Sequence, residues 1–157
     1  MRVFDELTRD FTVATFVVCK AKILLLWHRK LQKWLPPGGH VEPNELPDEA
    51  AMREVREEAG VEVELVGEIG LPVESPRQLM RPAGIQLEDI CPGHQHIDLI
   101  YFARPIDPSQ ITTTGNAESE AVGWFSLTEL AALRVIPDVR LWAERAIQAV
   151  DLASSRT

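Results

Sequence analysis

Three glutamates in the segment REVREEAG, residues 53–60, carry the strongest chemical signal in the sequence. If the segment is helical, Glu54, Glu57 and Glu58 fall within about 100° of one another and share one face. This crowding is unfavourable, because like charges at i,i+4 repel by about 0.2–0.5 kcal/mol and carboxylates in the last turn oppose the helix dipole by about 0.3–1 kcal/mol. A solvated acidic face is one interpretation. We favour a site for a divalent cation, because Mg²⁺ selects oxygen ligands and would turn each repulsion into a contact.

The helix that must carry these glutamates is predicted to run from Pro47 to Ala59. A proline is tolerated in the first turn of a helix, and Gly60 suits the position just after its end. Met52 and Val55 lie on a separate apolar stripe, which would anchor the helix on a sheet. The acidic face would then be turned away from the core.

Short apolar runs bounded by turn residues predict strands in the rest of the chain. These runs cover residues 12–19, 22–29, 61–69, 96–103 and 121–127. Residues 31–45 are rich in proline and glycine and are predicted to form a loop, and residues 71–93 are predicted to be irregular.

Two further helices are expected near the C-terminus. Ser126 and Glu129 have the S-x-x-E spacing of a capping box, and the last helix is predicted to start at Pro137. One mixed sheet covered by helices, an α/β fold, is the simplest architecture for this order of elements.

Composition limits the classes of protein to which the chain can belong. Its 157 residues include 16 Lys plus Arg and 24 Asp plus Glu, a net charge of −8 that disfavours binding to nucleic-acid backbones. No apolar run approaches the ~20 residues of a membrane span, and no secretory signal is visible. Cys19 and Cys91 form neither a disulfide framework nor a metal-binding spacing. We therefore expect a cytoplasmic protein with one domain over residues 1–157 and no membrane partner.

From Gly39 to Val61 the sequence follows the pattern G-x5-E-x7-R-E-U-x-E-E-x-G-U, where U is aliphatic. This pattern resembles the signature of the Nudix hydrolase family, and WLPPGG before it and AVGWFSLTEL after it are also similar to that family. The resemblance implies an α/β/α sandwich around a mixed β-sheet. It also implies a hydrolase that cleaves the diphosphate linkage of a nucleoside diphosphate joined to another group, with Mg²⁺ or Mn²⁺ as the cofactor.

The resemblance implies a metal-binding role for the acidic face. Glu54, Glu57 and Glu58 match the metal-binding carboxylates of the family, joined by a backbone carbonyl from the Gly38–Gly39 turn, which we assign to Gly39. This assignment agrees with elementary chemistry, because glycine lets backbone oxygen approach an ion closely.

Two other residues of the pattern match a supporting pair. Glu45 and Arg53 correspond to the residues that brace the helix against the loop, and such a pair orients a neighbouring metal ligand. Leu46 departs from the family, which commonly has a small hydroxyl residue there to cap the helix. The lost cap costs on the order of 1 kcal/mol of stability and bears little on chemistry.

The general base is predicted to be a carboxylate near the metal. Glu54 and Glu58 are the first candidates, because they lie on the helix that carries the cation. In some family members the base comes from a later loop, and here that loop would supply Glu118 or Glu120 as the base or an extra metal ligand. A plain polar loop is the alternative for these two residues.

The expected substrate contacts lie around the glycine-rich turn. Positive charges before this turn suit phosphate groups, Trp34 could stack on a base, and His94 or His96 could face the substrate. An exposed basic turn and a core tryptophan are the alternatives, and an H-x-H pair at the start of a strand is by itself only a weak signal of a metal site. The predicted substrate-binding residues are Arg29, Lys30, Lys33, Trp34, Gly38 and His96.

The substrate stays open at this point. Pro76 lies fifteen residues beyond Val61, a spacing that the family associates with ADP-ribose. A modified nucleoside triphosphate, as in MutT-type enzymes, fits equally well. Residues 71–93 are expected to line the pocket for the part of the substrate beyond the phosphates, or else to be surface or a homodimer contact.

Two rival classes would bind related ligands without this hydrolysis. A non-catalytic Nudix-like domain could bind a nucleotide as a sensor, although such regulators carry a fused DNA-binding module. An isomerase of prenyl diphosphates would need a catalytic cysteine that the pattern lacks. A hydrolase with a small nucleotide substrate is therefore our preferred prediction.

Overall fold

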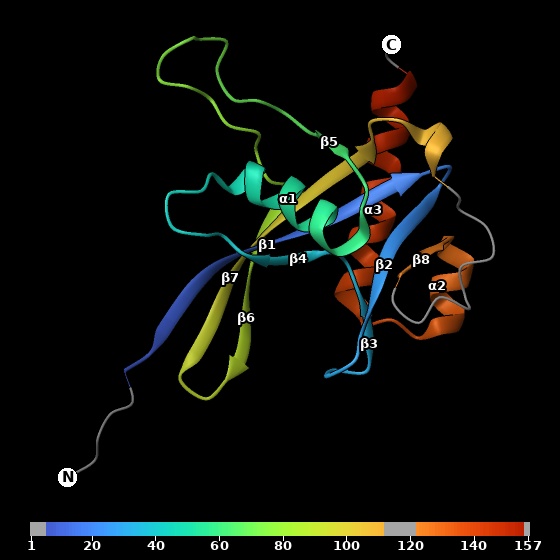
Figure 1. Ribbon diagram of the computed structural model, residues 1–157, viewed down its shortest axis with the longest axis horizontal. Coiled ribbons are helices and arrows are strands. Elements are labelled where there is room, and N and C mark those ends of the chain that lie inside the picture. The colour runs from blue at the N-terminus through green and yellow to red at the C-terminus, as the bar shows by residue number, and fades with distance from the viewer. Residues whose placement is uncertain (1–5, 112–121, 156–157) are drawn as a thin grey trace.

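A computed structural model describes residues 6–111 and 122–155 of the chain. At the centre of its mixed sheet, β1 (Thr8–Cys19) and β7 (His94–Pro105) run parallel, with Thr8 opposite His94 and Val17 opposite Ala103. The remaining strands pair antiparallel with their neighbours. They are β2 (Lys22–His28), β3 (Lys33–Leu35), β4 (Gly38–His40), β5 (Val63–Val66), β6 (Gly84–Cys91) and β8 (Val122–Phe125) (Figure 1).

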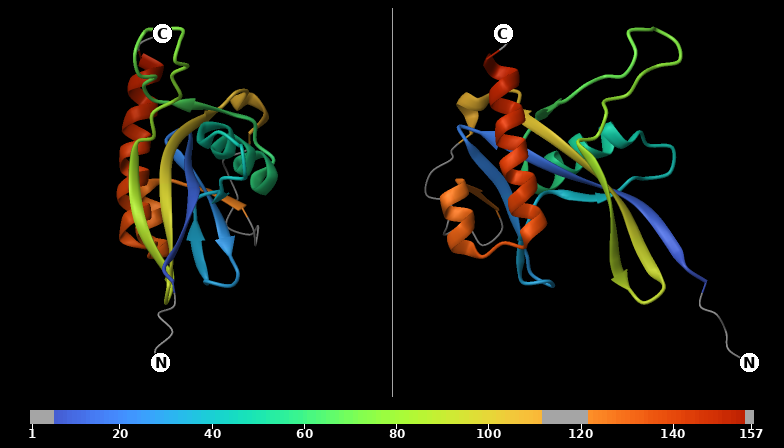
Figure 2. Two further views of the ribbon diagram at one scale, coloured as in Figure 1. Left: turned by 90° about the vertical axis from the view of Figure 1, so that its left-hand side faces the viewer. Right: turned by 180° about the vertical axis from the view of Figure 1, so that it is seen from behind.

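Helices cover both faces of this sheet, as Figure 2 shows. The helix α1 (Pro47–Ala59) packs on one face, and α3 (Pro137–Ser155) packs on the other, preceded by the short α2 (Leu127–Leu133). The alternation of side chains along β1 explains both contacts, because successive residues of a strand face opposite sides. Phe16 packs in the cluster that includes α3, and Val13 packs against α1. The predicted α/β/α sandwich is therefore confirmed.

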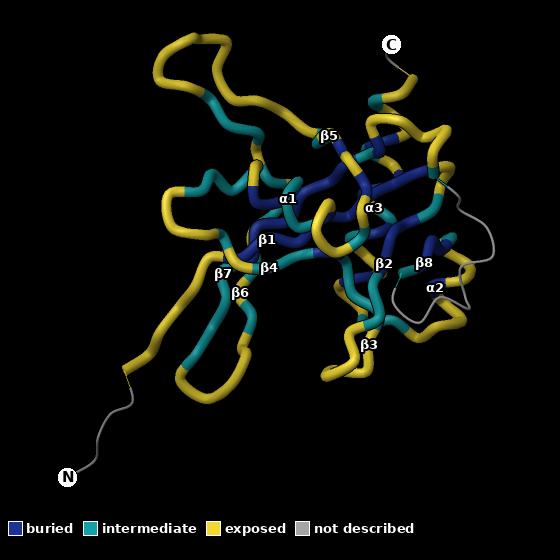
Figure 3. The backbone as a smooth tube through the Cα atoms, viewed as in Figure 1, coloured by how far each residue is buried: buried dark blue, intermediate teal, exposed yellow. Residues whose placement is uncertain are grey.

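Burial follows these layers (Figure 3). β1 is buried from Thr12 to its end at Cys19, while its first four residues are exposed. β6 alternates between partly buried and exposed residues up to Glu88 and is exposed from Asp89 to Cys91. Among the described residues, no helix is both long and apolar enough to cross a membrane.

The local signals for α1 are confirmed at both ends. The helix starts at Pro47, and Gly60 follows it with a left-handed φ of 69° and donates its backbone N–H to the carbonyl of Arg56. Leu46 precedes the helix with no side-chain hydrogen bond to it, as its apolar side chain requires. The capping box between Ser126 and Glu129 is also present at the start of α2.

Two predictions of irregular structure are wrong. The segment 31–45 contains β3, which pairs with β2, and β4, which pairs with β1. Gly38 allows the pairing of β4, because a side chain at this position would collide with the carbonyl oxygen of Val13 in β1. The segment 71–93 contains β6, whose alternation is inverted, with Ile85 and Leu87 exposed and the polar residues partly buried. Its flanking prolines hid this strand from sequence reasoning.

Candidate active site

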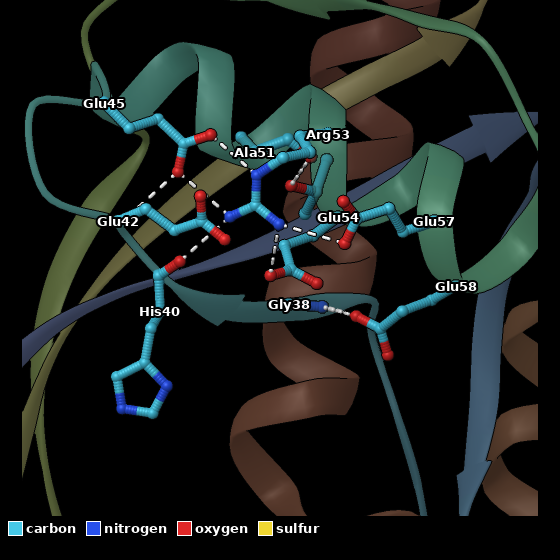
Figure 4. A network of polar contacts seen from close by, with 10 residues as sticks. Gly38, His40, Glu42, Glu45, Ala51, Arg53, Glu54, Glu57 and Glu58 are labelled. Carbon is cyan, nitrogen blue, oxygen red and sulfur yellow. Dashed lines mark hydrogen bonds and ion pairs between the residues drawn. The ribbon is translucent and has the colours of Figure 1, made fainter.

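Arg53 is the centre of a polar network between α1 and the loop before it (Figure 4). Its guanidinium binds Glu45 with two bonds, Nε to Oε2 at 2.6 Å and Nη2 to Oε1 at 2.9 Å. Nη1 donates to Glu54 Oε1 and to Glu57 Oε2, both at 3.0 Å, and Nη2 donates to the His40 carbonyl at 3.0 Å. The guanidinium of Arg53 therefore contacts the carboxylates of Glu45, Glu54 and Glu57.

The pair of Glu45 and Arg53 fastens the loop to the helix. The Arg53 hydrogen bonds hold the pKa of Glu45 below its ordinary value, and Glu45 also accepts the backbone N–H of Glu42 at 3.1 Å. A two-bonded guanidinium and carboxylate fix direction as well as distance. Glu54 is therefore oriented by a side chain that is itself held in place.

Glu58 is held from the other side of the acidic face. Its Oε1 accepts the backbone N–H of Gly38 at 2.9 Å. The pKa of Glu58 is raised to about 7, chiefly because protein atoms displace water from its carboxyl, and then because Glu54 and Glu57 are close. Three carboxylates this close together form a negatively charged site next to the Gly38–Gly39 turn.

The donor set fits the Mg²⁺ or Mn²⁺ that the sequence predicts. A Cβ atom on Gly39 would lie 2.5 Å from Oε1 of Glu54, so only glycine permits this approach. Glu54, Glu57 and Glu58 each use one carboxylate oxygen in the contacts with Arg53 or Gly38 and have a second oxygen beside it. Carboxylate and carbonyl oxygens are the ligands that these hard cations prefer.

A cleft of about 980 Å³ opens beside this site. Glu58 and the start of β4, Gly38–Gly39, form one part of its wall. Residues of β1, β2, β3, β6, β7 and α3 form most of the rest. Of the predicted substrate-binding residues, Lys33, Gly38 and His96 line the cleft. Three of the six residues that the sequence analysis predicted to bind substrate therefore meet around one cleft.

The other predicted contacts lie elsewhere. Arg29 and Lys30 are exposed at the turn between β2 and β3, and neither is among the described residues that line the cleft. Trp34 is partly buried and packs against the core cluster, edge-on to Phe125 with ring centroids 4.9 Å apart. Glu118 and Glu120 lie outside the described residues.

The deep end of the cleft holds a polar group that sequence reasoning missed. Thr12 donates to the buried Asp98 at 2.9 Å, and Trp142 donates its indole N–H to Gln86 at 2.9 Å. Burial and the nearby Glu88 raise the pKa of Asp98 to about 7. Asp98, Gln86, Glu88 and Trp142 all line the cleft.

The sequence contains a signal for Asp98 but not for Trp142. Asp98 is a single acidic residue inside an otherwise apolar strand, which marks a polar group that needs a partner. Trp142 gave no such signal, because it falls on the apolar side of the last helix. Residues 71–83 do not line the cleft, so the expected contribution of the segment 71–93 comes from β6.

Comparison with known proteins decides the family. The sequence model of the family described as NUDIX domain matches residues 8–149. The chain belongs to the Nudix hydrolase family. Its pattern from Gly39 to Val61 is therefore a Nudix box, and α1 is the helix of that box.

Relatives of this Nudix protein include solved and named members. A NUDIX-family hydrolase from Clostridium perfringens is 36% identical with a TM-score of 0.77, covering 92% of this chain and 99% of that one. A candidate 8-oxo-dGTP diphosphatase of Bacillus subtilis is 38% identical over 64 residues, 39% of this chain and 43% of that protein. The asymmetrical bis(5'-nucleosyl)-tetraphosphatase of Sus scrofa is 25% identical over 118 residues, 75% of this chain and 72% of that protein. The match to the Bacillus protein thus spans less than half of its length.

Proposed function

We propose that this Nudix protein uses Mg²⁺ or Mn²⁺ to hydrolyse the diphosphate linkage of a nucleoside diphosphate joined to another group. The observation that supports this most is the convergence of Glu54, Glu57 and Glu58 on one face of α1 beside the Gly38–Gly39 turn, with Glu58 on the wall of the cleft. A phosphate chain in the cleft would then lie next to the carboxylates. Because those carboxylates repel a phosphate, a cation between them is required for binding.

Each residue of the site has a separate task in this proposal. Glu54, Glu57 and Glu58, with the carbonyl of Gly39, would hold the cation, which when bound neutralises phosphate oxygens and lowers the pKa of water. Glu54 or Glu58 would accept the proton of the attacking water. Arg53 is a positioning residue, since its side chain binds the glutamates and the loop.

A modified nucleoside triphosphate is the substrate class that we favour. Trp27 and Trp142 offer aromatic surface in the cleft, and Gln86 and Asp98 offer hydrogen-bonding groups at its deep end, a combination suited to a nucleobase. The name of the Bacillus relative points to the same class. Pro76, whose spacing from the box is the sequence signal for ADP-ribose, does not line the cleft.

Product analysis with a panel of substrates tests this function. Purified protein with Mg²⁺ should hydrolyse 8-oxo-dGTP to 8-oxo-dGMP and inorganic pyrophosphate faster than it cleaves dGTP, ADP-ribose or diadenosine tetraphosphate. Glu54→Gln should lower kcat by at least ~10² while the protein stays folded. Glu49→Gln, an exposed residue on the same helix, is the matched control and should keep kcat within about twofold.

The contrary results are equally specific. Tight nucleotide binding without turnover of any substrate would favour the sensor alternative, and equal activity of Glu54→Gln and the wild type would remove the box helix from catalysis. The cytoplasmic location, the single domain over residues 1–157, the lack of nucleic-acid and membrane partners, and a possible homodimer stay predictions.

A further inference from the structure

Four side chains with metal-binding atoms meet at one end of the sheet, apart from the glutamates of the Nudix box. β1 and β7 are parallel with Asp10 opposite His96, and His94 lies two residues before His96, so that all three side chains face the same side. β4 pairs with β1 and brings His40 to the same place. The rings of His40 and His94 each lie about 5 Å from the ring of His96, at 5.0 and 5.1 Å between centroids.

The distances in this cluster match the spacing of metal ligands. One ligand atom each from Asp10, His94 and His96 lies within 4.8 Å of the others. Oδ2 of Asp10 is 3.3 Å from Nε2 of His94 and 3.2 Å from Nε2 of His40. Bonds of about 2.0–2.1 Å in a tetrahedral zinc site separate neighbouring ligand atoms by about 3.3 Å. Two pairs therefore have the spacing of ligands around a tetrahedral cation, which for Asp10 and His40 is also the distance of a hydrogen bond.

Thr8 contacts one ring nitrogen of His94. Its hydroxyl oxygen lies 2.8 Å from Nδ1 of His94 and 3.3 Å from the carbonyl oxygen of Gly93. In the tautomer of His94 with its proton on Nδ1, the hydroxyl accepts from Nδ1 and donates to Gly93, and the lone pair of Nε2 faces Oδ2 of Asp10. This tautomer is the one that could bind a cation through Nε2. A metal-bound histidine commonly has this arrangement, because its second ring nitrogen donates to a nearby oxygen.

The ligand types select the metal. Imidazole nitrogen suits zinc and its transition-metal neighbours, whereas Mg²⁺ prefers oxygen. Asp10 and His40 are about half exposed, so an ion can reach the cluster from solvent. At this end of the sheet β1, β6 and β7 extend beyond α1 and α3 (Figures 1 and 2). An ion bound to the cluster would join β1, β4 and β7, the strands that supply its ligands.

We propose that Asp10, His94 and His96, with His40 as the fourth ligand, form a Zn²⁺ site separate from the glutamates of the Nudix box. The ion cross-links β1, β4 and β7 at the end of the sheet. Because His96 lines the cleft and His40 follows Gly39, the site lies next to the catalytic pocket without sharing a ligand with it. This proposal does not depend on the hydrolase activity.

Zinc binding in the presence of excess Mg²⁺, which fills the oxygen site of the box, tests the proposal. Equilibrium dialysis of the chelator-stripped protein should show one tightly bound Zn²⁺ per chain, and Zn²⁺ should raise the melting temperature. Asp10→Asn and His94→Gln should each weaken Zn²⁺ binding at least ~10-fold. Thr8→Val should weaken it about 10-fold by removing the outer hydrogen bond, and Thr8→Ser should restore it.

His28→Gln is the matched control, because His28 is the histidine outside the cluster, and it should bind Zn²⁺ like the wild type. Asp10 is exposed enough that its asparagine variant should fold normally, which circular dichroism and the metal-free melting temperature will check. Equal Zn²⁺ affinity in the wild type, Asp10→Asn and His94→Gln would overturn the proposal. So would a wild-type melting temperature that Zn²⁺ leaves unchanged, since the cluster would then be a proton-sharing network of Asp10 with protonated histidines.

Discussion

Arg53→Gln is the sharpest test of how the box helix is held together. The substitution removes the positive charge that contacts Glu45, Glu54 and Glu57. Glu45 and Glu54 are mostly buried, at 14% and 13% of their side-chain surface exposed, so they lose a partner where water replaces it poorly. Removing one partner of a buried ion pair costs about 3–5 kcal/mol. Glu57 is 56% exposed and adds only about 0.3–0.5 kcal/mol.

We therefore expect Arg53→Gln to lose about 3–5 kcal/mol of the free energy of unfolding. Urea unfolding with chelator present, followed by tryptophan fluorescence, measures this without any contribution from bound metal. Arg56→Gln is the control, because Arg56 is exposed and meets Glu62 at 3.9 Å, and it should change stability by less than about 0.5 kcal/mol. Arg53→Lys keeps the charge without the two-bonded geometry and should fall between the two.

A double-mutant cycle separates the Glu45 pair from the rest of the network. Glu45→Gln together with Arg53→Gln should lose less than the sum of the single changes by at least ~1 kcal/mol, because the second substitution removes a charge that is already unpaired. A loss below ~1 kcal/mol for Arg53→Gln, or full additivity with Glu45→Gln, would refute this account of the network.

Three further predictions follow from single contacts. Gly39→Ala should lower Mg²⁺ affinity and kcat at least ~10-fold, because the added Cβ would lie 2.5 Å from Oε1 of Glu54 and displace it. Isothermal titration measures the affinity, and a steady-state assay measures kcat. In the folded protein the pKa of Asp98 is about 7, against an ordinary 3.8, so the stability that the protonated Asp98 contributes below pH 3.8 is lost as the pH rises through 7. Asp98→Asn keeps the acceptor for Thr12 and carries no charge. Its urea midpoint at pH 8 with chelator should therefore exceed that of the wild type. Mg²⁺ should raise the wild-type melting temperature, and Glu57→Gln should reduce that rise while costing less than about 0.5 kcal/mol in chelator.

The local parts of the fold could be predicted from the sequence. Pro47 and Gly60 marked the ends of α1, and the turn at Lys20–Ala21 has the positive φ values of 50° and 57° that a tight hairpin between β1 and β2 requires. β4 and β6 were missed because their evidence is non-local. Their strand character comes from pairing with β1 and β7, whereas their own sequences are rich in turn residues or bounded by them.

The site shows the same division. Spacing on one helix predicted that Glu54, Glu57 and Glu58 share a face, and the contacts of Arg53 and Gly38 agree with it. The deep end of the cleft could not be predicted in this way, because Trp142 and Gln86 are 56 residues apart and meet only through the packing of α3 on the sheet. For Trp34 the sequence was misleading. Its position close to Gly38 in the sequence suggested a contact with the substrate, whereas its ring packs on Phe125.

These contacts answer how so many like charges are tolerated in the box helix. Arg53 offsets Glu54 and Glu57, and the backbone N–H of Gly38 binds Glu58, so most of the repulsion is already balanced without a cation. Arg56, the other nearby cation, turns away toward Glu62. The helix therefore does not need metal in order to form. If these carboxylates hold a cation as we propose, they are already oriented before it binds, and binding then costs little conformational entropy.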